Sequence, residues 1–125
     1  ARVEVVDTPL PGSREIITGY ETLSAGEDSA LVRLRLETGR THQIRAHLQH
    51  AGYPLIGDVK YGDRRVNASV AQRTGLTTQL LHARKLIFTG LPEPFAYLNG
   101  KEATAPLPPQ WAFIQKELFG KEIIE

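Results

Sequence analysis

The chain has 125 residues, 41% of them hydrophobic, a formal net charge of +1 and no cysteine. This length is enough for a single domain that buries its own core. The lack of cysteine excludes disulfides and thiolate metal sites and fits a reducing compartment. No apolar run approaches the roughly 20 residues of a membrane span, and no signal or transit peptide is evident. We therefore expect a cytoplasmic protein without membrane contact.

Basic charge is concentrated in the middle of the chain. Residues 33–85 hold ten Lys or Arg against three Asp or Glu, whereas both flanking regions are net acidic. Most of these basic residues are arginine, which favours a local phosphate-binding surface. The alternative is a solvated basic face with no ligand, and the charge distribution alone does not decide between the two.

The first third of the chain predicts β structure. Valines in residues 2–6 indicate a short strand. Residues 15–23 and 30–38 alternate apolar and polar side chains, which predicts an antiparallel hairpin with a bulge at Gly19.

A helix is predicted directly after this hairpin. Gly39 ends the alternating pattern, and apolar residues then recur at helical spacing over 42–51. Thr41 is the expected N-cap, because its hydroxyl can accept a hydrogen bond from an unpaired backbone N–H. Gly52 is the expected residue just past the C-terminal end.

Two further helices and three strands are predicted in the rest of the chain. The helices cover 66–74, closed by Gly75, and the region between Pro109 and Gly120; the strands cover 79–89, 94–98 and 101–105. Asn99-Gly100 predicts a type I′ turn between the last two strands. The whole pattern indicates an α+β fold, with a mostly antiparallel mixed sheet and a few packed helices.

The octapeptide Thr38–Arg45 (TGRTHQIR) carries the strongest functional signal. It lies where a predicted strand meets a predicted helix, so unpaired N–H groups and the positive end of the helix dipole face outward. Arg40 is placed to bind a phosphate there. Arg45, one turn further, can form a two-point bond with a carboxylate, unless it makes an ordinary intramolecular ion pair.

The histidines nearby do not indicate a metal site. At about 100° per residue, His47 and His50 share a helix face that His42 does not. No thiol exists, and no carboxylate on this helix has the usual ligand spacing. We expect His42 to make a local hydrogen bond.

Several segments together resemble the RluA-like branch of the RNA pseudouridine synthases. They are Gly39–Leu48 (GRTHQIRAHL), Gly52–Asp58 (GYPLIGD), Tyr61-Gly62, Leu81-His82-Ala83 with Leu86 and Phe88, and Ala105–Pro108 (APLP). The order and spacing of these blocks match the family over roughly residues 15–110.

The resemblance implies a catalytic fold that isomerises uridine to pseudouridine in structured rRNA or tRNA, with no metal and no organic cofactor. An aspartate attacks the uridine nucleotide after the base is flipped out, and the detached base rejoins through carbon. Arg45 matches the active-site arginine that pairs with this aspartate. The positions implied to face RNA or line the pocket are Arg40, His42, Gln43, Leu81 and His82.

The nucleophile segment of the family, His-Arg-Leu-Asp followed by Thr-Ser-Gly, is not in this sequence. Tyr20 does not match the base-stacking tyrosine either, because its surroundings differ. We therefore expect residues 1–125 to form a single domain or fragment, the C-terminal half of a catalytic domain, inactive alone. Its partners would be RNA, the missing N-terminal half, or a second copy through an exposed sheet edge.

An unpaired buried guanidinium would cost several kcal/mol. We therefore expect Arg45 to lie partly exposed in a groove rather than deeply buried in an ion pair with Glu37 or Asp58. Two alternatives to the synthase remain: a non-catalytic RNA-binding module, and a hydrolase or transferase that uses His42 or His47 as a base.

Overall fold

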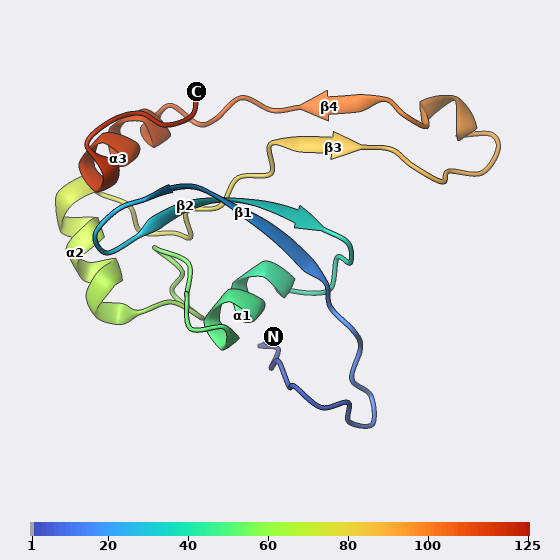
Figure 1. Ribbon diagram of the computed structural model, residues 1–125, viewed down its shortest axis with the longest axis horizontal. Helices are drawn as coiled ribbons and strands as arrows, with labels where there is room; N and C mark the ends of the chain where they lie inside the picture. Colours follow the sequence, from blue (N-terminus) through green and yellow to red (C-terminus); the bar gives the residue numbers. More distant parts are fainter. Residues whose placement is uncertain (1) are drawn as a thin grey trace.

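The computed structural model describes residues 2–125 and has an α+β architecture, as predicted (Figure 1). Its elements in chain order are β1 (Thr18–Ala25), β2 (Ala30–Leu36), α1 (Gln43–His50), α2 (Arg64–Thr74), β3 (Lys85–Ile87), a 3₁₀ helix (Ala96–Leu98), β4 (Glu102–Thr104) and α3 (Gln110–Phe119). The strands form two separate antiparallel pairs, β1–β2 and β3–β4, rather than one mixed sheet.

The predicted hairpin is confirmed, but its bulge lies elsewhere. Gly19 pairs regularly with Arg35, and the register shifts between Thr22 and Ser24, so Leu23 is the extra residue. The prediction of a bulge at Gly19 is therefore wrong.

The strand predicted over residues 2–6 is also wrong. The segment has other partners: the backbone N–H of Val3 donates to the Tyr61 hydroxyl at 2.9 Å, and the side chain of Arg2 donates through Nη1 to the Lys60 carbonyl at 2.6 Å. The hydroxyl of Tyr61, 58 residues further along the chain, accepts the Val3 N–H that would otherwise need a neighbouring strand.

Helix α1 begins one residue later than predicted. Its N-cap is His42 rather than Thr41, and His42 adopts a left-handed conformation with φ of 52° and caps no N–H through its side chain. Left-handed backbone is unfavourable for a residue with a Cβ, so the surrounding contacts must hold His42 in place.

The other two helices follow their capping residues. Helix α2 starts at Arg64, two residues earlier than predicted, because the Asp63 carboxylate accepts hydrogen bonds from two N–H groups of its first turn. Gly75 and Gly120 close α2 and α3 in the left-handed conformation, as predicted.

The strand predicted over 94–98 is wrong, because residues 96–98 form a 3₁₀ turn and β4 pairs with β3 instead. Two prolines at positions 92 and 94 remove the N–H groups that a ladder needs. Asn99 (φ −57°, ψ 131°) and Gly100 (φ 86°) form a turn of type II rather than type I′.

The core lies between α2 and α3. It contains the buried side chains of Val70, Leu76 and Ile114, with Ile56, Leu80 and Leu118 packed against them. The β3–β4 arm extends away from these helices (Figure 1). No helix within residues 2–125 is both long enough and apolar enough to cross a bilayer.

Candidate active site

Gln43 fixes the turn between β2 and α1. Its side chain is 4% exposed, and Oε1 accepts hydrogen bonds from the Thr38 hydroxyl and the Arg40 N–H at 2.7 and 2.9 Å. Nε2 donates to the Ile17 carbonyl and the Thr18 hydroxyl, both at 3.0 Å. A direct contact of Gln43 with RNA would have to replace one of these bonds.

His42 is held by Tyr61, which is almost fully buried. His42 Nδ1 lies 2.9 Å from the Tyr61 hydroxyl, and the two rings meet edge to face. Because this hydroxyl also accepts the Val3 N–H, its own proton is available to Nδ1. That arrangement leaves the His42 proton on Nε2, which has no hydrogen-bond partner within residues 2–125.

Burial, and then the positive charges of Arg45 and Lys60, lower the pKa of His42 below its ordinary value of 6.5. Both effects favour the neutral imidazole, whose Nε2–H can then act as a donor.

Arg45 forms a two-point ion pair with Asp58. Arg45 Nε lies 2.7 Å from Oδ2 and Nη2 lies 2.9 Å from Oδ1. The Arg45 side chain is 19% exposed and the Asp58 side chain is fully buried. Arg45 is therefore partly exposed, as expected, but the expectation that it is not held in an ion pair with Asp58 is wrong.

The loop that carries Asp58 is itself fixed. Oδ1 of Asp58 accepts the backbone N–H groups of Lys60 and Tyr61, both at 3.0 Å. Asn67 on α2 donates to the Asp58 carbonyl at 3.0 Å and accepts the Gly57 N–H at 2.8 Å. Both oxygens of the carboxylate therefore have fixed donors, although from the sequence Asp58 was named only within the GYPLIGD block and as a carboxylate with which Arg45 was not expected to be buried in an ion pair.

The contacts of the pair favour the charged form of both members. Burial raises the pKa of the Asp58 carboxyl, but the bonds from Arg45 and from the Tyr61 and Lys60 N–H groups outweigh burial and hold it below 3.8. The hydrogen bond to Asp58 raises the pKa of Arg45 from its ordinary value, against the opposing effect of burial.

Tyr61 also packs against two guanidinium groups. Arg45 Cζ lies 5.1 Å and Arg2 Cζ lies 4.7 Å from the centre of its ring, both within cation–π range. Arg45 is thus fixed by a carboxylate and by an aromatic ring. Its Nη1 makes no hydrogen bond within the described chain, so this end of the guanidinium remains available.

Arg40 differs from the arginines of β2. Arg33 and Arg35 pair with Glu21 and Glu37, so their charges are locally balanced. Arg40 is exposed, and its side chain has no ion-pair or hydrogen-bond partner within residues 2–125.

The Leu81-His82 segment has two different surroundings. The Leu80 N–H donates to the Ile56 carbonyl at 2.8 Å, which brings the start of this segment beside the loop of Asp58. His82 Nε2 instead lies 3.1 Å from the Ala105 carbonyl, and its ring meets the Trp111 ring edge to face. The structure therefore places Leu80, the residue before Leu81, beside the loop of Asp58 and directs His82 toward α3.

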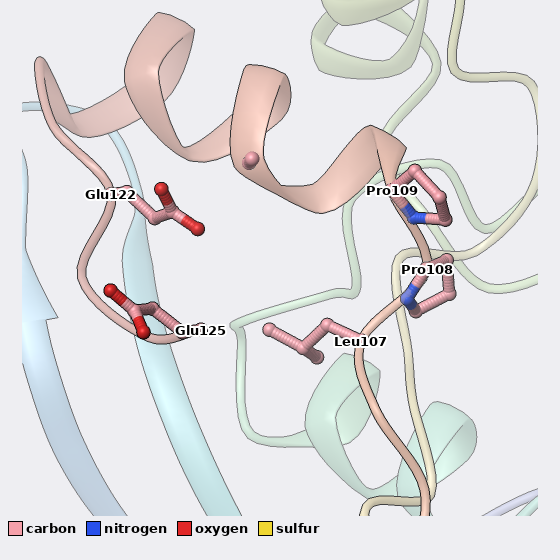
Figure 2. Close-up of a pocket in the computed structure, with 6 residues that line it drawn as sticks. Leu107, Pro108, Pro109, Glu122 and Glu125 are labelled. Carbon is pink, nitrogen blue, oxygen red and sulfur yellow. The ribbon is translucent and has the colours of Figure 1, made fainter.

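A cavity of about 340 Å³ lies between the start of α3 and the C-terminal tail (Figure 2). Pro108, Pro109 and Leu107 line one side, and Glu122 and Glu125 line the other. Two carboxylates at this position would repel a phosphate backbone, so this cavity is not part of the candidate site.

Comparison with known proteins agrees with the motif. Residues 1–50 match the family model described as RNA pseudouridylate synthase. An uncharacterized RNA pseudouridine synthase of Chloroflexus aurantiacus is 41% identical over 109 residues, which are 87% of this chain and 31% of that protein. The tRNA pseudouridine synthase C of Pasteurella multocida is 47% identical over 60 residues, 48% of this chain and 25% of that protein.

A third relative, the ribosomal large subunit pseudouridine synthase C of Vibrio vulnificus, is 40% identical over 79 residues, 63% of this chain and 25% of that protein. The chain thus spans between a quarter and a third of the length of these relatives. It belongs to the RNA pseudouridine synthase family.

The ion pair should make the effects of substitutions at Arg45 and Asp58 on the free energy of unfolding non-additive. We expect Arg45→Ala and Asp58→Ala each to lower the free energy of unfolding by about 3 kcal/mol, because each leaves one partner unpaired. The double variant should lose at least about 1 kcal/mol less than the sum of the single losses. Urea unfolding of the four proteins measures this, and additive losses would contradict the pairing.

Acid unfolding should depend on Asp58. A native pKa below the unfolded value means that the folded state favours the carboxylate, so this stabilisation is present above about pH 4 and is lost as pH falls through the native pKa. Asp58→Asn should therefore show a flatter stability profile than the parent between about pH 5 and pH 2. Asp63→Asn, which keeps a capping side chain, is the control; equal slopes for the parent and Asp58→Asn would refute this assignment.

Proposed function

We propose that this chain supplies the catalytic arginine, Arg45, and part of the RNA-facing surface of an RNA pseudouridine synthase. The substrate is a uridine in structured rRNA or tRNA, and the product is pseudouridine. The nucleophilic aspartate comes from a polypeptide segment that these 125 residues do not contain, so the chain alone is inactive.

The observation that supports this role best is that only some of the N–H donors of the Arg45 guanidinium are bound within residues 2–125. Its Nε edge binds Asp58, whereas its Nη1 end has no partner within residues 2–125. An arginine fixed on one edge can bind a second carboxylate through the other. Such a contact would orient the nucleophile and stabilise its ionised form.

The surrounding groups suit an extruded nucleotide. The exposed Arg40 can neutralise a phosphate, and the Nε2–H of neutral His42 can donate to a phosphate or base oxygen. Leu81, 38% exposed, offers apolar contact to a flipped base. Gln43 supports this surface by fixing the turn between Arg40 and α1.

One observation favours a non-catalytic RNA-binding module instead. Asp58 already neutralises Arg45, so the chain is electrostatically satisfied without any external carboxylate. A module of this kind would bind RNA but would not gain activity from any partner segment.

Complementation separates the two functions. The chain is mixed with a polypeptide that carries the His-Arg-Leu-Asp-type segment of the family, and pseudouridine is measured in an rRNA transcript. We expect activity only in the mixture, and Arg45→Ala should lower it by at least about 100-fold, as expected when a preorganised charge contact is removed.

Arg35→Ala is the matched control in this assay, because Arg35 is an exposed arginine that is already paired with Glu37. It should leave the activity of the mixture unchanged. Modification of RNA by the chain alone, or full activity of the Arg45→Ala mixture, would contradict the proposal.

RNA affinity should depend on Arg40. Arg40→Ala should weaken binding of the chain to structured RNA by about 3-fold to 10-fold and reduce the slope of log K against log salt by about one. Arg35→Ala should change both values less, because its charge is balanced by Glu37. Fluorescence anisotropy at several salt concentrations measures both values; identical effects of the two substitutions would remove Arg40 from the RNA surface.

A further inference from the structure

We infer that Asp58 is a positioning residue for catalysis: it holds the Nε edge of Arg45 so that the Nη1 end is presented to a second, incoming carboxylate. This inference rests on the proposed function of Arg45. It assigns to Asp58 a role distinct from that of the nucleophile.

The donor geometry of arginine allows both contacts at once. A guanidinium carries five N–H donors in a rigid plane, and the pair with Asp58 uses one on Nε and one on Nη2. Of the three remaining donors, one on Nη2 and one on Nη1 lie side by side on the end of the group. A second carboxylate can bind that end without displacing Asp58.

Asp58 can fix the position of Arg45 because the position of Asp58 is itself held by burial and hydrogen bonds. Its side chain is fully buried, Oδ1 also accepts two backbone N–H groups, and Asn67 holds the adjacent backbone from α2. Gly57 allows this loop to pass close to the Thr78 backbone, because a Cβ at this position would clash with the Thr78 carbonyl oxygen. By contrast, the Arg35–Glu37 pair is exposed and restrains neither partner.

The charge balance predicts which kinetic constant depends on Asp58. The Arg45–Asp58 pair carries no net charge, so it contributes little to the attraction of RNA phosphates. Misplacing Arg45 should therefore lower kcat and leave the KM for RNA nearly unchanged.

The first test measures the position of Arg45 directly in the 125-residue chain. The hydrogen exchange of its Nε–H is followed by ¹⁵N-detected NMR in the parent, in Asp58→Asn and in the control Asp63→Asn. We expect at least 10-fold faster exchange in Asp58→Asn, because the asparagine NH₂ cannot accept this hydrogen bond, and no change in the control. Unchanged exchange in Asp58→Asn would overturn the inference.

The second test uses the complementation mixture. Asp58→Asn and Asp58→Glu should each lower kcat by about 100-fold, the loss expected for a displacement of about 1 Å, with KM for RNA within about 3-fold of the parent. Asp58→Glu keeps the charge, so it tests positioning even if Asp58→Asn does not fold. Parental kcat in a folded Asp58 variant would show that the pair is only structural.

The two tests separate the inference from the proposed function. If the parent mixture forms no pseudouridine, the proposed function fails. The exchange measurement still decides whether Asp58 fixes Arg45.

Discussion

The part-buried ion pair between Arg45 and Asp58 joins helix α1 to the loop that follows it. In that loop, Asp58 also accepts hydrogen bonds from two backbone N–H groups. Tyr61, in the same loop, packs against the Arg45 guanidinium and binds His42 and the N-terminal segment through its hydroxyl. A buried pair of this kind contributes little net stability, but removal of one partner is costly. Its main effect here is to fix where a charged group points.

The site therefore combines side chains that are fixed by hydrogen bonds with donor groups that have no partner within residues 2–125. Gln43 fixes the turn before α1 from one side, and the loop of Asp58 fixes Arg45 from the other. The groups that remain available, the Arg40 side chain, the His42 Nε2–H and the Nη1 end of Arg45, are those that can meet an anion. A site with preorganised donors and few free rotamers is the arrangement that stabilises charge with little reorganisation.

Sequence patterns correctly predicted the elements that are determined by interactions between residues close in the sequence. The β1–β2 hairpin followed from alternation, and α3 followed from helical spacing between Pro109 and Gly120. The predictions were wrong where residues far apart in the sequence determine the structure. Residues 2–6 form no strand and Val3 bonds to Tyr61, and β4 pairs with β3 rather than with residues 94–98. The motif identified Arg45 and its chemistry. The expectation that Arg45 is not held in an ion pair with Asp58 was wrong, because a contact across thirteen residues depends on how the intervening loop folds.

The decisive measurement is a structure of this chain bound to the polypeptide that carries the aspartate segment. We expect the incoming aspartate within about 2.7–3.0 Å of Arg45 Nη1 or Nη2, with Asp58 still bound at Nε. An aspartate that displaces Asp58, or an Arg45 that faces away from the aspartate, would contradict it.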